Sequence, residues 1–410
     1  MLIANAVLTD ANGQKQGALR IEDNLIADVG DLDAREGEEI LDAAGLWLTP
    51  GLIDLNFHLK DPGHKRIETI AESTRSALAG GITTILAAPD TTPPIEDETV
   101  AEYILAKATE ADAARILFAG EIARQNRLNN IAKLFAAGAS AIAGSSALDS
   151  NILRRAFEYA LMAGKPALIS CQNSALAGNG VIHDGEIGSR LGLPAIADYA
   201  ESSEAARVVE IASAVGCKLV VEAVSAKRSV DLIAALKPAN AVLQTLLPHL
   251  VLTDEACAGF NVACKLNPPL RSAADRAALI KAVKESGSAI IASGHLPQDM
   301  SSRDRPFETA SAGLDIAGYF LSLAYTKLVA AGEMTIAEFI RAAALIPARV
   351  LGENAGSLTV GARADLILFD PAARREVGSR DGVAKSPWDG EVLFGLVKSA
   401  IVGGRLKNLR

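Results

Sequence analysis

Between residues 49 and 350, apolar segments of strand length alternate with amphipathic segments of helix length, and this alternation restricts the fold more than any other feature. The apolar segments include GITTILAAP (81–89), ARILFAGEI (114–122), KPALISC (165–171), CKLVVEAVS (217–225), NAVLQTLLP (240–248) and SAIIASGHL (288–296). The helical segments include IETIAESTRSALAGG (67–81), SEAARVVEIASAVG (203–216) and AADRAALIKAVKESG (273–287). Strands that are apolar on both faces are typical of a parallel sheet covered by helices. About 300 residues of this alternation favour an α/β fold, a (β/α)8 TIM-type barrel, over an open sheet.

The two ends of the chain share a different pattern. Short runs such as LIANAVLTD (2–10) and GALRIED (17–23) are separated by turn signals, and GSLTVGARADLILFDP (356–371) and LVKSAIVGGRLKNL (396–409) repeat this texture. Such runs predict β-strands. We therefore predict a composite β-sandwich domain from residues 1–48 and 351–410, and a barrel from residues 49–350.

Charge and composition exclude several classes of protein. A net charge of −9 argues against nucleic acid or an anionic membrane surface as the main partner. The four cysteines, Cys171, Cys217, Cys257 and Cys264, form no CxxC pair, which suits a reducing compartment. The N-terminal segment lacks the pattern of a signal peptide, and no apolar run has the length of a membrane span. We expect a soluble, cytoplasmic protein.

Several motifs follow one another along nearly the whole chain. PGLIDLNFHLKDPG (50–63) is similar to the motif PG-[LF]-[IV]-D-x-H-x-H-x-R-x-P-G. AGGITTILAAPDTTPPIED (79–97) resembles the block GG-[FI]-TT…MPNT.P, and SGHLPQ (293–298) is similar to a later block, TDHAPH. With GEIGSRLGLPAIADYAE (185–201), KLNPPLRS (265–272) and the C-terminal strand pair, these segments resemble the dihydroorotase branch of the amidohydrolase superfamily in its long, two-domain form.

The resemblance implies a barrel that carries two Zn²⁺ ions and a bridging hydroxide, and that hydrolyses a cyclic amide. Two such ions repel each other unless anionic groups bridge them, and each needs imidazole or carboxylate donors at about 2 Å. A carboxylate must also accept the proton of the attacking hydroxide.

Most positions that the family uses for these roles carry residues that bind zinc poorly or not at all. The family positions hold Asn56 and His58 in the first motif, Gly144 and Ser145 at the bridging ligand, Ser170 and Ala223 at the two later histidines, and Gly294 at the general base. The chain has five histidines, His58, His64, His183, His249 and His295, and His58 alone falls on a ligand position. We therefore predict that the zinc site is lost and that the protein has no cofactor and no catalytic residues.

The positions that bind substrate in the family have also changed. Lys60 replaces an Arg that grips the substrate carboxylate, Asp90 replaces an Asn, and Gln298 replaces a His, while Asn267 is retained. An aspartate at position 90 would repel an anionic substrate. We predict that Lys60, Asp90, Asn267 and Gln298 remain as a vestigial substrate pocket.

Other reactive-looking residues have simpler interpretations. His58 is either a relic ligand for a single adventitious metal or a buried, hydrogen-bonded core histidine, and we favour the second. We expect a structural role for His295, a small buried side chain at Cys171, and exposed loops around His64 and His183. The segment SSRDRP (301–306) is interpreted as a solvated surface loop.

The residues that build the fold stay close to the family pattern, whereas those that perform the chemistry do not. This contrast indicates a non-catalytic dihydroorotase homologue. Such relatives serve in several bacteria as non-catalytic chains of assemblies with aspartate carbamoyltransferase. The resemblance therefore implies a structural subunit in de novo pyrimidine biosynthesis, with a homodimer of this chain inside a hetero-oligomer.

Two alternatives remain open at this stage. The first is a divergent metal-dependent cyclic amidohydrolase with one weakly held metal, in which Asp90, Glu222 or Asp299 would have to be recruited as the base. The second is an interaction scaffold outside pyrimidine metabolism.

Overall fold

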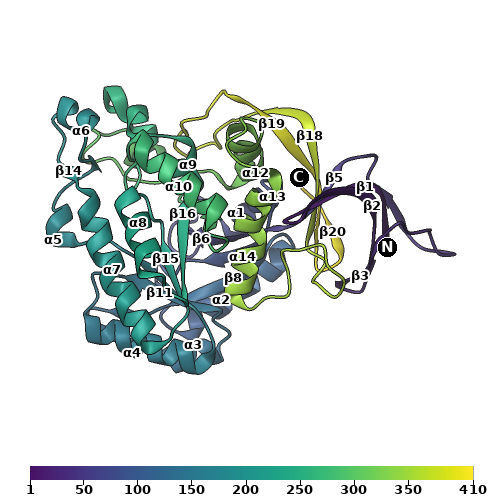
Figure 1. Cartoon of the computed structure of the whole chain (residues 1–410), viewed down its shortest axis with the longest axis horizontal. Helices are drawn as coiled ribbons and strands as arrows, with labels where there is room; N and C mark the ends of the chain where they lie inside the picture. Colours follow the sequence, from purple (N-terminus) through teal and green to yellow (C-terminus); the bar gives the residue numbers. More distant parts are fainter. Residues whose placement is uncertain (410) are drawn as a thin grey trace.

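The computed structural model describes residues 1–409 and contains two large sheets. One is an eight-stranded parallel sheet that curls into a barrel surrounded by helices (Figure 1). Its strands, in chain order, are β6 (Leu52–Phe57), β7 (Ile82–Ala87), β8 (Arg115–Glu121), β11 (Ala141–Ser145), β12 (Ala167–Ser170), β15 (Leu219–Glu222), β16 (Ala241–Leu246) and β17 (Ile290–Ala292). Each strand pairs with the next, and the predicted barrel is confirmed.

The first and last strands of the barrel meet just beyond their carboxyl ends. The backbone N–H of His58 donates a hydrogen bond to the carbonyl of His295 over 2.9 Å, and Phe57 forms a parallel bridge with His295. This contact nearly closes the sheet, so that side chains following the strands converge on one opening.

Helices cover the outside of the barrel. The α-helices are α1 (Ile70–Ala79), α2 (Glu98–Ala111), α3 (Ile131–Ala136), α4 (Ser150–Ala163), α5 (Ser174–Ala177), α6 (Glu186–Leu191), α7 (Asp198–Val215), α8 (Lys227–Leu236), α9 (Leu247–Val251), α10 (Ala273–Glu285), α11 (Met300–Arg303), α12 (Phe320–Ala324), α13 (Ile336–Ile340) and α14 (Ile346–Leu351). Shorter helical turns are η1 (Asp254–Phe260), η2 (Val262–Cys264), η3 (Ala317–Tyr319), η4 (Tyr325–Val329) and η5 (Arg341–Leu345).

Capping residues explain where two of the predicted helices begin. Thr69 and Glu72 form a reciprocal capping box at the start of α1, and Ser272 and Asp275 do the same for α10. Helix α7 begins at Asp198, ahead of the predicted segment, and no side chain caps it. Its early start therefore follows from tertiary packing, which overrides the local signals.

The second sheet combines both ends of the chain. Its strands are β1 (Leu2–Asp10), β2 (Gly13–Glu22), β3 (Leu25–Gly30), β4 (Ile40–Asp42), β5 (Trp47–Pro50), β18 (Leu366–Glu376), β19 (Val392–Val402) and β20 (Arg405–Lys407). Strand β5 joins the two ends, because it pairs with β1 in parallel and with β18 in antiparallel orientation. The sheet is mixed, has its own apolar core and projects from one side of the barrel (Figure 1). The exact division at residues 48 and 350 stays a prediction.

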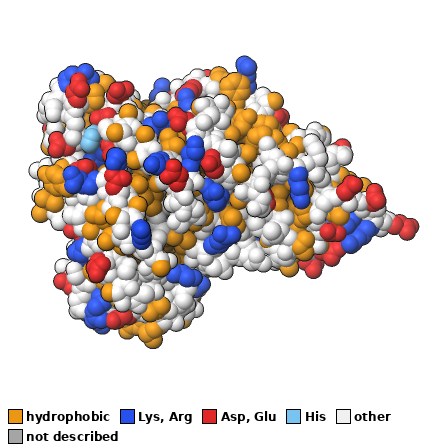
Figure 2. All heavy atoms as spheres, in the orientation of Figure 1, with side chains coloured by type: hydrophobic (Ala, Val, Ile, Leu, Met, Phe, Trp, Pro, Cys, Tyr) orange, Lys and Arg blue, Asp and Glu red, His pale blue; other side chains and the backbone are white. Residues whose placement is uncertain are grey.

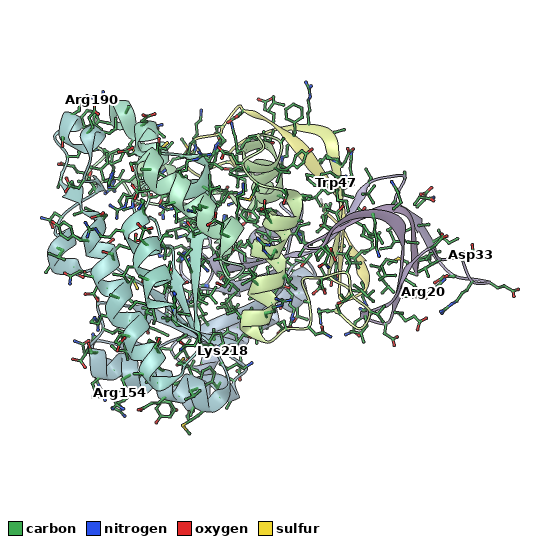
Figure 3. The ribbon with its side chains drawn as sticks, viewed as in Figure 1. Arg20, Asp33, Trp47, Arg154, Arg190 and Lys218 are labelled. Carbon is green, nitrogen blue, oxygen red and sulfur yellow. The ribbon has the colours of Figure 1, made fainter. Side chains whose placement is uncertain are left out.

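Aromatic packing fixes the sheet against the barrel. Trp47 lies at the junction (Figure 3), and its ring centroid is 5.6 Å from that of Tyr325 and 6.0 Å from that of Phe369. Figure 2 shows acidic and basic side chains interspersed over one face of the molecule. Among residues 1–409, no helix combines the length and the apolar character needed to cross a bilayer.

A segment between β18 and β19, residues 377–391, returns from the sheet to the barrel. The N–H of Ala384 donates to the carbonyl of Gln298 over 2.8 Å, and the ring of buried Trp388 lies edge-on to Tyr319. We call residues 377–391 the return segment. It holds the loop that follows β17 in place.

Candidate functional site

A cavity of about 920 Å³ opens at the carboxyl ends of the barrel strands. All seven positions that the sequence assigns to the lost zinc site line this cavity: Asn56, His58, Gly144, Ser145, Ser170, Ala223 and Gly294. They come from five different strand ends, as expected when parallel strands finish at one face of a barrel. The structure therefore brings these positions together.

Of the four residues predicted to remain as a vestigial substrate pocket, two line the cavity and two do not. Asp90 and Asn267 line the cavity, whereas Lys60 and Gln298 lie outside its lining. The side-chain amide of Gln298 donates to the backbone carbonyl of Ala312 over 2.9 Å and is therefore engaged outside the cavity lining. The role of these residues in binding stays a prediction.

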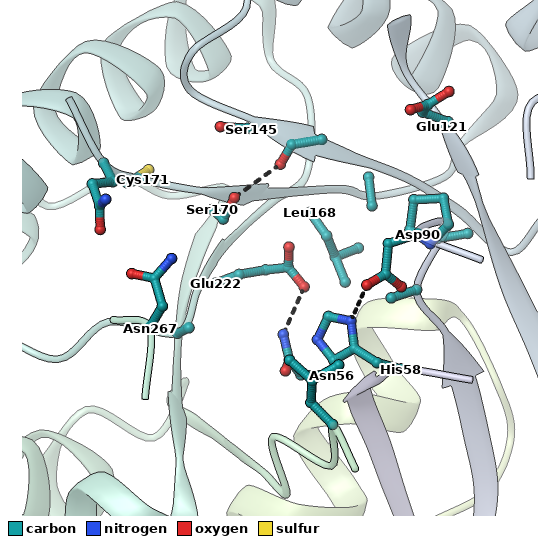
Figure 4. Close-up of a pocket in the computed structure, with 18 of the residues that line it drawn as sticks. Asn56, His58, Asp90, Glu121, Ser145, Leu168, Ser170, Cys171, Glu222 and Asn267 are labelled. Atoms are coloured by element: carbon teal, nitrogen blue, oxygen red, sulfur yellow. Dashed lines mark hydrogen bonds and ion pairs between the residues drawn. The ribbon is translucent and has the colours of Figure 1, made fainter. Parts of the chain in front are cut away.

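His58 and Asp90 form a pair on the cavity wall (Figure 4). His58 Nδ1 lies 2.8 Å from Asp90 Oδ2. Burial opposes the charged form of each group, but the attraction between them outweighs this effect. As a result the pKa of His58 is raised and the pKa of Asp90 is lowered. The hydrogen bond predicted for His58 is present, but its side chain is 22% exposed on the cavity wall and is not buried in the core.

A second pair joins the strands β6 and β15. The side-chain amide Nδ2 of Asn56 lies 3.3 Å from Oε1 of Glu222 (Figure 4). Burial raises the pKa of Glu222 to about 7, although the neighbouring charge of His58 and the hydrogen bond from Asn56 act in the opposite direction. Glu222 is therefore partly protonated near neutral pH.

Sequence reasoning missed Glu121, which lines the same cavity. Burial raises the pKa of Glu121, while a hydrogen bond from Asn129 opposes the shift. The available signal was its place as the last residue of β8, since a charged residue at the carboxyl end of a barrel strand faces the opening. Gln125 and Asn126, at the tip of the hairpin formed by β9 (Ala123–Arg124) and β10 (Arg127–Leu128), also reach the lining and were missed.

The donors in this cavity do not fit a pair of zinc ions. Among residues 1–409, His58 supplies the only imidazole on the lining, and its Nδ1 is engaged by Asp90. Two former donor positions are glycines packed against apolar side chains. A Cβ at Gly144 would lie 3.2 Å from Ile122 Cδ1, and a Cβ at Gly294 would lie 2.9 Å from Leu246 Cδ1. Neither glycine supplies a donor, and apolar side chains fill the space beside each of them.

One group of three potential metal donors lies outside the cavity lining, at Glu68, His295 and Asp315. His295 Nε2 lies 2.9 Å from Glu68 Oε2, and His295 Nδ1 accepts the backbone N–H groups of Ile316 and Ala317. Both ring nitrogens are thus occupied.

A guanidinium already balances the two carboxylates of this group. Arg380 of the return segment lies 2.7 Å from Glu68 Oε1 and 2.9 Å from Asp315 Oδ2. The fully buried His295 therefore belongs to an ion-pair network that connects the return segment to the barrel, which agrees with the structural role expected for it.

One expectation about loops is wrong, and another holds only in part. His183 was expected in an exposed loop, but it is half-buried in β13 (Ile182–His183), where its Nδ1 lies 3.2 Å from Nη1 of the buried Arg271. The segment 301–306 was expected to be a solvated loop, and Ser301, Asp304, Arg305 and Pro306 are exposed, but residues 301–303 belong to α11. Arg303 is buried there and donates hydrogen bonds to backbone carbonyls. The side chains of His183 and Arg303 face inward because their hydrogen-bond partners lie in other segments of the chain.

The remaining expectations of this kind agree with the structure. His64 is exposed. Cys171 is buried beside β12, and burial raises the pKa of its thiol, which disfavours the nucleophilic thiolate.

Together, the fold and the cavity define a (β/α)8 barrel protein with a cavity at the carboxyl ends of the strands and a β-sheet contributed by both chain ends. The chain belongs to the amidohydrolase family, whose sequence profile matches residues 47–406. It is 33% identical over 398 residues to a dihydroorotase of Trichlorobacter lovleyi, covering 94% of this chain and 93% of that protein. It is 35% identical over 396 residues to a dihydroorotase of Pelotomaculum thermopropionicum, covering 94% and 92%.

Solved structures support the same fold. An L-hydantoinase (dihydropyrimidinase) from Arthrobacter aurescens superimposes with a TM-score of 0.86 at 21% identity, covering 99% of this chain and 95% of that one. A D-hydantoinase superimposes with a TM-score of 0.83 at 22% identity, covering 99% and 94%.

Proposed function

We propose that this chain is a catalytically inactive dihydroorotase homologue that serves as a structural subunit. One observation carries the proposal: of the seven family ligand positions that converge on the barrel cavity, six hold Asn56, Gly144, Ser145, Ser170, Ala223 and Gly294, and His58 is the only imidazole. Hydrolysis of a cyclic amide by two metal ions needs bridging and terminal donors that these residues lack. The chain keeps the barrel of its relatives but not the donor set.

We propose aspartate carbamoyltransferase as the partner, in de novo pyrimidine biosynthesis, with a homodimer of this chain inside the hetero-oligomer. The support is the resemblance of the sequence motifs to non-catalytic dihydroorotase homologues, together with relatives that are named dihydroorotase. In this role the chain contributes buried interface area, which stabilises the partner by mass action.

Solution mass tests the assembly. The protein is mixed with the aspartate carbamoyltransferase chain of its own organism and measured by light scattering after size exclusion, beside each chain alone. We expect one larger species that contains both chains. Separate elution at every mixing ratio would refute the partner.

Inactivity needs its own measurement. The purified protein is assayed for hydrolysis of dihydroorotate with and without added zinc, and its metal content is determined after dialysis. We expect no turnover and far less than one zinc ion per chain. Stoichiometric zinc together with turnover would refute the inactive subunit, whatever the outcome of the mass measurement.

The His58–Asp90 pair and the carboxyl group of Glu222 favour a second candidate, a divergent cyclic amidohydrolase. These groups lie on one wall of the cavity, and a carboxyl group with a pKa of about 7 can act as a general base near neutral pH. A screen of cyclic amides would identify such an activity. It belongs to this site only if His58→Ala and Glu222→Gln both abolish it, while Glu285→Gln on the exposed face of α10 leaves it unchanged.

A further inference from the structure

Helix α4 presents an apolar surface to solvent in its C-terminal half. Among residues 1–409, Met162 has the largest exposed fraction of any large apolar side chain, 82%. Tyr159 and Leu161, in the same turn of the helix, are also exposed, and Ala163 follows them. The solvent-facing positions of a surface helix are normally polar. This half of α4 is therefore apolar where a solvated helix would be polar.

The N-terminal half of the same face is charged. Arg154 and Arg155 are exposed there, and Glu158 follows within one turn. Arg154 forms an ion pair with Glu158 along the helix. Arg155 has neither an ion pair nor a side-chain hydrogen bond with any other residue between 1 and 409. The face thus combines an unpaired cation, a carboxylate one turn away and an apolar end.

The spacing of these residues makes the face complementary to itself. Positions 151, 155, 158 and 162 follow the i, i+4, i+7, i+11 spacing and form one ridge along α4. When two copies of the helix pack antiparallel about a two-fold axis between residues 156 and 157, Arg155 of each copy faces Glu158 of the other. A parallel pair would instead set like charges against each other. Charge complementarity therefore selects the antiparallel arrangement of two identical helices.

Apolar contacts accompany the two ion pairs in this arrangement. The helical period places Tyr159 of one copy beside Ile152 of the other, and Ile152 is only partly buried within its own chain. It also places Leu161 along the aliphatic stem of Arg154. Figure 1 shows α4 at the outer edge of the barrel, on the side away from the second sheet, so a second copy has access to it. One partner thus satisfies both the charged and the apolar half of the helix.

We propose that α4 is the surface through which two copies of this chain form a two-fold symmetric homodimer. This inference rests on the homodimer of the proposed function and names the residues that form its contact. It does not depend on the carbamoyltransferase. A single pair of helices buries less than the roughly 800 Å² per partner of a standard interface, so we expect a dissociation constant in the micromolar range.

Analytical ultracentrifugation of the full chain over a range of micromolar concentrations tests the proposal. We expect a reversible equilibrium between monomer and dimer. Arg155→Glu should raise the dissociation constant about tenfold, because it sets two carboxylates against each other at both symmetric positions. Combining it with Glu158→Arg should restore the dimer, since the exchanged charges pair again. Met162→Ser should weaken the dimer through the loss of apolar contact.

Matched controls come from exposed residues on other helices. Arg190→Glu on α6 makes the same change of charge, and Met300→Ser on α11 makes the same apolar-to-polar change. Both should leave the dissociation constant unchanged. Thermal melting followed by circular dichroism establishes that each variant is folded.

The outcomes separate the contact surface from the proposed function. A monomer at every concentration would overturn both this inference and the homodimer of the proposed function. A dimer that is insensitive to Arg155→Glu, or that the exchanged pair of charges does not restore, would overturn the α4 contact alone. Loss of the mixed complex with aspartate carbamoyltransferase in Arg155→Glu, while the homodimer persists unchanged, would also overturn it and would assign α4 to that partner.

Discussion

The side-chain amide of Asn56 donates to the carboxyl group of Glu222 over 3.3 Å, so an amide stands where the family motif places an imidazole. The two residues are 166 positions apart in the chain and meet because β6 and β15 end at the same face of the barrel. This pair occupies the wall on which a metal would have to be held. Replacing Asn56 with histidine therefore tests whether zinc binding can be restored at this wall.

Asn56→His should not restore a zinc centre. It adds one imidazole, but Gly144, Ala223 and Gly294 still lack donors, and two zinc ions need several. We expect the variant to retain less than one zinc ion per chain after dialysis, as measured by plasma emission spectroscopy beside the parent protein. Two tightly held zinc ions per chain would contradict the assignment of these positions.

Glu222→Gln should stabilise the protein at high pH. The pKa of Glu222 is about 7 in the folded state against an ordinary value of 4.5, so the folded state binds the proton more tightly. Its contribution to stability is fully present below pH 4.5 and is lost as the pH rises through about 7. Because Glu222 borders the cavity and is partly hydrated, we expect the variant to gain about 1–2 kcal/mol at pH 8 and little at pH 5.

Urea unfolding of both proteins at the two pH values measures this difference. Glu285→Gln is the control, since an exposed acid should show no such dependence on pH. An equal change at pH 5 and pH 8 would mean that the substitution acts through packing rather than through ionisation.

His249 should make the protein sensitive to acid. Its side chain is buried, and burial lowers its pKa to about 4 from an ordinary value of 6.5. The neutral imidazole contributes stability that is fully present above pH 6.5 and is lost as the pH falls toward 4, because the unfolded chain takes up the proton first. The loss between pH 8 and pH 5 should be about 2 kcal/mol.

His249→Gln removes the titration and keeps a donor for the carbonyl of Pro268, which His249 Nε2 contacts over 3.1 Å. We expect the free energy of unfolding of this variant to fall less between pH 8 and pH 5 than that of the parent. His64→Gln, at an exposed histidine, is the control and should follow the parent. Parallel pH profiles for all three proteins would refute the prediction.

Arg380→Gln should destabilise the attachment of the return segment. The substitution removes the cation that pairs with Glu68 and Asp315, and Glu68 is fully buried, so its carboxylate would lose a charge partner. We expect a loss of about 3 kcal/mol in the free energy of unfolding. Hydrogen exchange should also accelerate at the amide of Ala384, because this residue of the return segment donates to the carbonyl of Gln298 in the barrel.

Arg374→Gln provides the comparison for this prediction. The guanidinium of Arg374 lies over the ring of Phe394, 4.9 Å from its centroid, and has no buried carboxylate to neutralise. We expect this variant to lose less than about 1 kcal/mol. Equal losses in the two variants would show that the ion-pair network contributes no more than a surface contact.

The sequence by itself determined the barrel and the place of its site. Strand segments such as 82–87 and 241–246 were readable because a strand buried on both faces needs a continuous apolar run, which is a local property. The convergence of Asn56, Ser170 and Gly294 followed from a general rule, since parallel strands of a barrel end at one face. These features depend on chain order and residue type alone.

Only the tertiary structure decided which side chains pair and how they are charged. The contact of Arg380 with Glu68 and the contact of His183 with Arg271 join residues far apart in the chain. The elevated pKa of Glu222 depends on how far its surroundings exclude water, which no local pattern encodes. Pairing and ionisation are set by distances and hydration in three dimensions, and these exist only once the strands and the return segment have come together.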